Sequence, residues 1–167
     1  MLLTPEYLFA AAEHITPAFL REKGITALAL DVDNTLTGDE SQILPPAVEQ
    51  WLADLRAAGI TLTVVSNNHP PRVEPFARRI GLDYVADAAK PRTRGLREYQ
   101  ARLGIPKNQM AMVGDQLFTD RLSAALFGIP CFVTVPRSWD THWWLLAKRV
   151  LEKPFLRRYY RKGGKLL

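Results

Sequence analysis

The chain has 167 residues, 47% of them hydrophobic and 23% charged, with a net charge of +5. These values are typical of one globular domain that is long enough to bury a stable core without disulfide or metal cross-links. The single cysteine, Cys131, excludes an intramolecular disulfide and a cysteine-built metal site, and it favours a reducing, cytoplasmic location. No targeting signal is expected, because no cationic region precedes the first apolar residues. No apolar run approaches the roughly 18 residues of a membrane span.

The positive charge is concentrated at the C-terminal end. Residues 141–167 contain eight Lys or Arg and one acidic residue, Glu152, which gives this segment a net charge of +7. The other 140 residues contain 14 basic and 16 acidic residues, for a net charge of −2. We therefore predict a nearly neutral domain over residues 1–136 and a basic tail over residues 137–167.

Helix-like and strand-like segments alternate along the predicted domain. Thr4-Pro5 and Thr16-Pro17 each predict the start of a helix, and glycine followed by Ile or Leu marks five helix ends. Strands that alternate with helices predict an α/β fold with a five-stranded parallel sheet. In chain order, the expected elements are helices over 5–14 and 17–23, strand TALALDV, helix 46–58, strand TLTVVS, helix 71–80, strand DYVA, helix 94–103, strand MAMVGD, helix 117–127 and strand CFVTV.

Polar residues follow the predicted strands at the point where each strand ends. Parallel α/β sheets bind ligands beyond the carboxyl ends of their strands, so these side chains are expected to share one edge of the sheet. A lysine in the third crossover is expected to join them. The candidate site residues are Asp31, Asp33, Ser66, Asn67, Lys90, Asp115 and Asp120.

The chemistry of this set favours a phosphoryl substrate and a hard cation. Several carboxylates stay ionised side by side only near a cation, because like charges raise one another's pKa. An oxygen-only cluster without histidine suits Mg²⁺. The Ser66 hydroxyl and the Lys90 ammonium supply the donors and positive charge that a phosphoryl group needs.

Four motifs of the sequence resemble those of one enzyme superfamily. DVDNT, the serine after the second strand, Lys-Pro and GDQLFTD are similar, in this order, to the four motifs of the haloacid dehalogenase (HAD) phosphatases. More narrowly, ITPAFLREKGITALALDVDNTL resembles the small YqeG-type phosphatases of subclass IIIA, which are related to mitochondrial phosphatidylglycerophosphate phosphatases. The resemblance covers about residues 5–135 and implies a three-layer, Rossmann-like fold.

The resemblance also implies a covalent mechanism. Asp31 would attack phosphorus and become an aspartyl phosphate. Asp33 would protonate the leaving group and then take a proton from the attacking water. Ser66 and Lys90 would hold the phosphoryl oxygens, with help from backbone N–H groups near Asn67.

The same resemblance implies how Mg²⁺ would be held. Its ligands would be Asp31, the backbone carbonyl of Asp33, and Asp115. Asp120 would act through water or as an orienting neighbour. A plain helix-capping role is the alternative for Asp120, which opens a predicted helix.

No cap domain is expected over the site. Only residues 37–45 separate the first motif from the next helix, and the 21 residues between Asn68 and Lys90 are used by one helix and one strand. An open site of this kind suits a bulky substrate or one presented on a surface.

The basic tail is predicted to form two amphipathic pieces that meet at Pro154. Aromatic residues beside a basic face are typical of a helix lying on an anionic membrane, which is the expected role of residues 139–162. Alternatively, the apolar face packs against the domain or a partner, and RNA binding is the third interpretation. The apolar residues are Trp139, Trp143, Leu146, Ala147, Val150 and Leu151 before Pro154, and Phe155, Leu156, Tyr159 and Tyr160 after it.

The sequence therefore predicts a capless, Mg²⁺-dependent phosphomonoesterase, cytoplasmic or peripheral to a membrane. A phospholipid such as phosphatidylglycerophosphate is the favoured substrate. Two alternatives remain open at this point: a phosphatase of a soluble small molecule, and an RNA- or ribosome-associated binding protein whose phosphatase site is secondary.

Overall fold

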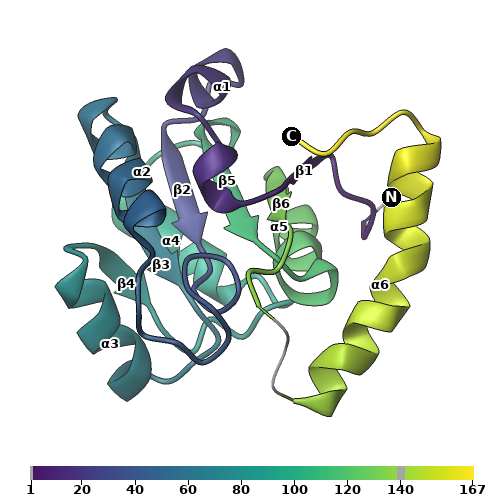
Figure 1. Cartoon of the computed structure of the whole chain (residues 1–167). Helices are drawn as coiled ribbons and strands as arrows, with labels where there is room; N and C mark the ends of the chain where they lie inside the picture. Colours follow the sequence, from purple (N-terminus) through teal and green to yellow (C-terminus); the bar gives the residue numbers. More distant parts are fainter. Residues whose placement is uncertain (1, 139–141) are drawn as a thin grey trace.

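A six-stranded parallel sheet forms the centre of the computed structural model, which describes residues 2–138 and 142–167 (Figure 1). The order of the strands is β1-β6-β5-β2-β3-β4, and all five pairings are parallel. The predicted α/β class is confirmed, but the predicted number of strands, five, is wrong. The strands are β1 (Tyr7–Phe9), β2 (Ala27–Leu30), β3 (Thr61–Val65), β4 (Asp83–Val85), β5 (Met110–Gly114) and β6 (Cys131–Thr134).

The additional strand, β1, lies where a short helix over 5–14 was predicted. Tyr7–Phe9 pairs with β6, and only the 3₁₀ turn η1 (Ala12–His14) is helical in this segment. Leu8 and Phe9 are both buried, in the cores on opposite faces of the sheet. This alternation is that of a strand, and the burial outweighs the helix-opening signal of Thr4-Pro5.

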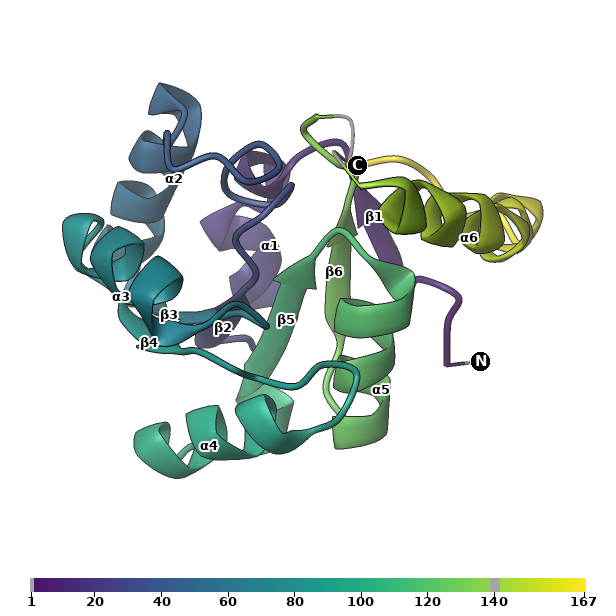
Figure 2. The ribbon, with the colours of Figure 1, turned by 90° about the horizontal axis from the view of Figure 1, so that it is seen from below.

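Helices cover both faces of the sheet, which gives the predicted three layers (Figure 2). Helices α1, α2 and α3 contribute to the core on one face, and α4 and α5 to the core on the other. A π-helical turn, η3, replaces the first turn of the predicted helix 117–127. The elements are α1 (Pro17–Glu22), α2 (Pro46–Ala57), α3 (Pro70–Arg79), α4 (Arg94–Leu103), η2 (Lys107–Gln109), η3 (Leu117–Arg121), α5 (Leu122–Phe127) and α6 (Trp143–Arg161).

The predicted helix boundaries agree with the observed capping. Thr16 Oγ1 accepts a hydrogen bond of 3.1 Å from Phe19 N at the start of α1. Gly104 and Gly128 end α4 and α5 with φ of 66° and 90°, a left-handed conformation that glycine adopts without steric cost.

The register of the central strands brings the predicted motifs to one edge. Leu30 of β2 lies opposite Val64 of β3 and Val113 of β5, so the three strands end at the same level. Every residue of β2 and β5 is buried, as expected for parallel strands covered on both faces. The residues that follow these strands are thereby held at one rim of a rigid core.

The tail forms one continuous helix, α6, rather than two pieces separated at Pro154. Pro154 removes one N–H donor, whose partner would be the carbonyl of Val150. Both residues lie on the exposed side of α6, where solvent can hydrate that carbonyl. Tyr159 is buried in the core that contains Leu8, and Leu166 forms an isolated β-bridge with Leu8.

No cap domain is present among the described residues. The segment between β2 and α2 is a short loop, and α3 and β4 account for most of the chain between β3 and Lys90. Among the helices of residues 2–138 and 142–167, none combines the length and hydropathy needed to cross a membrane.

Candidate active site

A cavity of about 390 Å³ opens at the carboxyl edge of the sheet. Asp31 and Asp33 line it from the loop after β2, Asn67 from the loop after β3, and Lys90 from the loop after β4. Gln116 and Thr119 line it from the region after β5. The strand ends therefore bring most of the predicted site residues together.

Lys90 lies between two of the predicted acidic residues. Its Nζ atom is 2.6 Å from Asp31 Oδ1 and 2.7 Å from Asp120 Oδ1, and its side chain is buried. Burial alone would lower the pKa of Lys90, but the carboxylates of Asp120 and Asp31 raise it above the usual value. Lys90 is therefore a permanent cation in this site.

Burial acts in the opposite direction on Asp31. It raises the pKa of the Asp31 carboxyl to about 7; Lys90 opposes the rise and Asp120 adds to it. Asp31 is 9% exposed and faces the cavity. The carboxylate is thus accessible but poorly hydrated.

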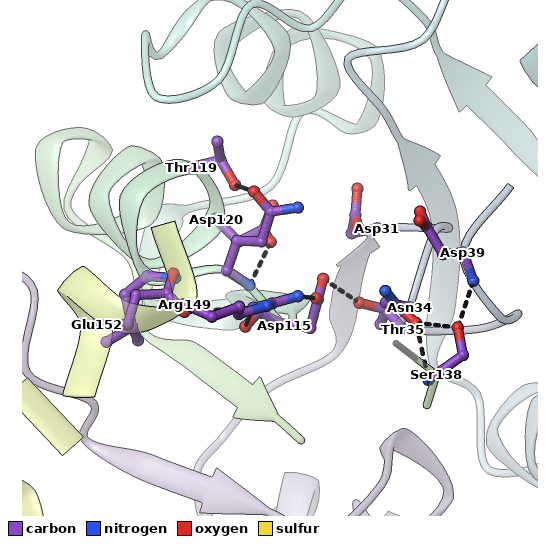
Figure 3. A network of polar contacts seen from close by, with 12 residues as sticks. Asp31, Asn34, Thr35, Asp39, Asp115, Thr119, Asp120, Ser138, Arg149 and Glu152 are labelled. Atoms are coloured by element: carbon purple, nitrogen blue, oxygen red, sulfur yellow. Dashed lines mark hydrogen bonds and ion pairs between the residues drawn. The ribbon is translucent and has the colours of Figure 1, made fainter. Parts of the chain in front are cut away.

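Asp115 is fixed from two sides (Figure 3). Thr35 Oγ1 donates to Asp115 Oδ1 over 3.2 Å, and the Arg149 guanidinium from α6 forms an ion pair with Asp115 Oδ2. Arg149 Nη1 also donates to the backbone carbonyl of Asp115 over 2.8 Å. Burial raises the pKa of Asp115 well above the usual value, although Arg149 opposes this rise.

Three carboxylates have the arrangement that a cation site requires. Asp31, Asp115 and Asp120 each offer an oxygen, and these oxygens lie within 4.8 Å of one another. The three negative charges exceed the two positive charges of Lys90 and Arg149, which contact them. A divalent metal fits this all-oxygen donor set and would relieve the remaining repulsion.

Close packing holds Asp120 against the end of β5. A Cβ atom built on Gly114 would lie 2.3 Å from Asp120 Cγ, so only glycine leaves room for this carboxylate. The backbone N–H of Gln116 donates to Asp120 Oδ2 over 3.1 Å. Gln116 is the N-cap residue of the π-helical turn η3, so Asp120 also satisfies a backbone donor at the start of this turn, although it does not occupy the N-cap position itself.

Asp33 is held by two residues that the sequence did not identify as functional. Asn68 Nδ2 donates to Asp33 Oδ2 over 2.6 Å, and Arg72 Nη2 lies 2.7 Å from Asp33 Oδ1. Both come from the loop and first helical turn after β3. The local sequence of this stretch predicts only the start of a helix. The two contacts fix the Asp33 carboxyl group, which lines the cavity.

Ser66 and Asn67 have different positions in the site. Ser66 is buried and its Oγ accepts a hydrogen bond of 3.1 Å from Asn68 N; it is not among the residues that line the cavity. Asn67 lines the cavity and exchanges two hydrogen bonds with the Lys90 backbone, of 2.9 and 2.7 Å. Asn67 thus positions the loop that carries Lys90.

The C-terminal region also holds the loop that follows β2. Asn34 has φ of 60°, a left-handed conformation that asparagine tolerates, and it turns the chain directly after Asp33. Asn34 Oδ1 accepts hydrogen bonds from Ser138 N and Oγ, and Asp39 N donates to Ser138 Oγ (Figure 3). Residues outside the predicted motifs thereby fix the loop that carries Asp31 and Asp33.

Glu152 is the most buried of the residues that α6 brings to this region. It is 3% exposed, and its Oε1 accepts a 2.6 Å hydrogen bond from Leu117 N, directly after the loop that carries Asp115. Its other oxygen lies 3.3 Å from Arg149 Nη1. The amphipathic pattern of the tail does not predict this role, because it places Glu152 and Arg149 on a polar face that is expected to be exposed to solvent.

Glu152→Ala is expected to reduce the free energy of unfolding by about 1–3 kcal/mol, because the Leu117 N–H would lose its buried acceptor. Glu152→Gln keeps an acceptor oxygen and should cost less. Urea unfolding of both variants measures the difference. Equal losses for the two substitutions would contradict the importance of this hydrogen bond.

Because the pKa of Asp31 is raised in the folded protein, the free energy of unfolding should depend on pH and on metal binding. Between the unfolded value of about 4 and the folded value of about 7, the metal-free fold holds a proton that the unfolded chain has released. This group therefore destabilises the metal-free protein progressively as pH rises through that window.

A divalent cation should stabilise the protein more at about pH 8 than at about pH 5.5, because it competes with fewer protons for the cluster at the higher pH. The measurement is the melting temperature in chelator and in excess MgCl₂ or MnCl₂, at matched ionic strength. A shift that is equal at both pH values, or larger in acid, would contradict the cation site.

Comparison with known proteins identifies the family of this fold. Residues 6–128 match the haloacid dehalogenase-like hydrolases. The chain belongs to this family. The HAD motifs predicted from the sequence all lie within the matched region, and the predicted class of enzyme is confirmed.

Individual HAD relatives cover most of the chain. It is 29% identical over 150 residues to the probable phosphatase YqeG of Bacillus subtilis (strain 168), covering 90% of this chain and 87% of that protein. It is 26% identical over 156 residues to phosphatidylglycerophosphate phosphatase 1, chloroplastic/mitochondrial, of Arabidopsis thaliana, covering 87% of this chain and 45% of that protein.

A solved structure shares the HAD fold. The hypothetical protein XCC2798 from Xanthomonas campestris superimposes with a TM-score of 0.56 at 21% identity, over 74% of this chain and 72% of that one. This likeness concerns the fold alone.

Proposed function

We propose that this HAD enzyme is a Mg²⁺-dependent phosphomonoester hydrolase that works through an aspartyl phosphate on Asp31. One observation carries the proposal. Asp31 faces the cavity beside Lys90 and within reach of Asp115 and Asp120, so a nucleophile, a fixed cation and a metal-binding cluster meet at one point. Membership of the HAD family and the name of the YqeG relative support phosphatase chemistry.

In the first step, an Asp31 carboxylate oxygen attacks phosphorus and the bond between phosphorus and the leaving-group oxygen breaks. Asp33 gives its proton to that oxygen. Lys90 stabilises the negative charge on the transferring phosphoryl group. Arg72 and Asn68 hold the Asp33 carboxyl in the cavity for this transfer.

In the second step, water attacks the phosphorus of the aspartyl phosphate and gives its proton to Asp33. The bond between phosphorus and the Asp31 oxygen breaks, which releases inorganic phosphate and restores both carboxyl groups. Asp33 thereby returns to the protonated form that the first step uses.

Asp31, Asp115 and Asp120 would hold the metal, with the backbone carbonyl of Asp33 as a further ligand. Mg²⁺ is proposed because all the available donors are oxygens. When bound, it would offset the negative charge of the substrate phosphate and of the carboxylates.

A lipid phosphate is the proposed substrate. The Arabidopsis relative is named for phosphatidylglycerophosphate. The apolar side of the first half of α6 is exposed rather than packed on the domain: Trp143, Val150 and Leu151 are 76%, 59% and 61% exposed. The first turn of this helix borders the cavity, so a membrane under α6 would lie beside the site.

Exposed basic residues complete the proposed membrane-binding side. Arg157, Arg161 and Lys162 lie on exposed positions at the C-terminal end of α6. Replacing all three with Gln should cost about 3 kcal/mol of binding to anionic vesicles, at roughly 1 kcal/mol per charge before screening by salt. Vesicle flotation at two salt concentrations measures the loss.

Hydrolysis of a soluble aryl phosphate by this triple variant should be unchanged, because none of the three residues lines the cavity. Unaltered flotation would overturn the membrane proposal, and binding of RNA instead of vesicles would favour the nucleic-acid alternative. An equal loss of aryl phosphate hydrolysis would mean that these residues support the fold.

A phosphatase screen of the purified chain tests the function itself. It should include lipid phosphates in mixed micelles, soluble sugar and nucleotide phosphates, and p-nitrophenyl phosphate, each with chelator and with MgCl₂. We expect metal-dependent release of inorganic phosphate, fastest for lipid phosphates. Preference for a soluble phosphate would replace the proposed substrate, and no release from any compound would contradict the enzyme assignment.

A further inference from the structure

The cavity extends well beyond the space that a phosphoryl group needs. At about 30 Å³ per heavy atom, the volume of a water molecule in the liquid, the four heavy atoms of a phosphoryl group would fill less than a third of the cavity volume of about 390 Å³. One part of its wall is formed by the start of α6, through Trp144, Leu145 and Lys148. These residues lie outside the region 6–128 that matches the family.

Contacts at the start and in the middle of helix α6 hold this part of the cavity wall in place. The ring of His142 stacks on Trp144 with a centroid distance of 4.1 Å, and His142 Nε2 lies 3.1 Å from Glu40 Oε1 in the loop after β2. Two turns further along, Glu152 accepts its hydrogen bond from Leu117 N. The wall is therefore tied to loops on two sides of the cavity.

Lys148 differs from the other cations that line the cavity. Lys90 is engaged with Asp31 and Asp120, and Arg72 is engaged with Asp33. Lys148 lines the cavity, is half-buried, and makes no hydrogen bond or ion pair with any residue in the described part of the chain. Its positive charge is available to a ligand.

The cavity is acidic where the loop after β2 lines it. Asp39 and Glu40 line it from the loop after β2, so an anionic group would be repelled there and attracted toward Lys148. Trp144 and Leu145 supply apolar surface next to the lysine. This combination is suited to an anion carried on a carbon chain.

We propose that Lys148, with Trp144 and Leu145, forms a subsite for a second anionic group on the leaving-group side of the substrate. The subsite rests on the proposed phosphomonoesterase function and specifies the substrate class: a phosphomonoester whose alcohol part carries another phosphate or a phosphodiester. Such a group belongs equally to a lipid headgroup and to a soluble bisphosphate. Lys148 is thus a specificity-determining residue.

The test compares substrates with and without a second anion. Wild type and Lys148→Gln are assayed with hexyl phosphate and hexane-1,6-diol bisphosphate, and with a short-chain phosphatidylglycerophosphate below its micelle concentration. Lys148→Gln should raise KM about tenfold for the two substrates with a second anion, as expected for the loss of one charge-assisted hydrogen bond. It should change kcat/KM for hexyl phosphate less than twofold.

Two further variants control for charge and fold. Lys165→Gln removes the same charge from an exposed position beyond the far end of α6 and should have no effect on any of the three substrates. Lys148→Arg should restore most of the lost affinity. A larger effect on the lipid substrate than on the bisphosphate would assign the subsite to the headgroup diester, and the reverse would assign it to a soluble substrate.

A binding measurement separates this inference from the proposed function. Calorimetry with hexylphosphonate and hexane-1,6-bisphosphonate, in MgCl₂, requires no turnover. Wild type should bind the bisphosphonate more tightly, and Lys148→Gln should abolish that advantage. Equal losses for both ligands, or no loss for either, would overturn the subsite, whereas a preserved preference without hydrolysis of any ester would overturn the proposed function alone.

Discussion

Asp31→Asn is expected to lower kcat for every phosphomonoester by at least roughly 10⁴-fold, because it removes the attacking oxygen that begins the reaction. The amide has nearly the same shape as the carboxyl group, so the β2 loop and the core should keep their structure. Steady-state release of inorganic phosphate measures the loss, and circular dichroism shows whether the fold is retained.

Asp54→Asn provides a matched control for this substitution. It makes the same chemical change at an exposed position of α2 and should leave the rate unchanged. Activity of Asp31→Asn within tenfold of wild type, in a pure and metal-replete sample, would refute the assignment of the nucleophile.

Asp33→Asn should separate the two chemical steps. The asparagine keeps the contact distance to Asn68 but cannot give or take a proton, so turnover of alkyl phosphates should fall by about 10²–10⁴-fold. p-Nitrophenyl phosphate has a leaving group that needs no protonation, so it should still phosphorylate Asp31. Stopped-flow absorbance should then show a burst of one nitrophenol per enzyme molecule, followed by very slow release of phosphate.

Asp83→Asn, at the exposed start of β4, should behave as wild type in the same assay. Linear nitrophenol release at the wild-type rate by Asp33→Asn would show that Asp33 has no acid–base role. If Asp33→Asn lost both the burst and steady-state turnover, Asp33 would be required already in the first step.

The sequence predicts the centre of the fold well, for a physical reason. The central strands β2 and β5 are short apolar runs that are buried on both faces, and glycines follow the helices, so local patterns coincide with the tertiary structure. Strand β1 was predicted as a helix because its three residues carry little periodic signal. Its partner is β6, more than 120 residues later in the chain.

The acidic site residues that directly follow strands can also be predicted from the sequence. Asp31 and Asp115 directly follow apolar strands, and parallel pairing brings them to one edge. Arg72 and Arg149 were missed as site residues, because they reach the site from helices whose position relative to the strand ends depends on tertiary packing.

The amphipathic pattern of α6 separates its two sides correctly but does not tell which side faces the domain. Over the first half of α6 the polar side packs inward, because Arg149 and Glu152 bind polar groups of the loop after β5. Trp143 and Val150 remain exposed. Trp139, which was predicted on the same apolar face, lies outside the described residues.

The most direct test of the proposed mechanism is a search for the covalent intermediate on Asp31 in the wild-type enzyme. Turnover of p-nitrophenyl phosphate in MgCl₂ is quenched with acid, and the digested protein is analysed by mass spectrometry. We predict a phosphoryl group on the peptide that contains Asp31, absent from Asp31→Asn and absent after chelation of the metal. Turnover without any phosphorylated peptide, or with the phosphoryl group on another residue, would contradict the mechanism.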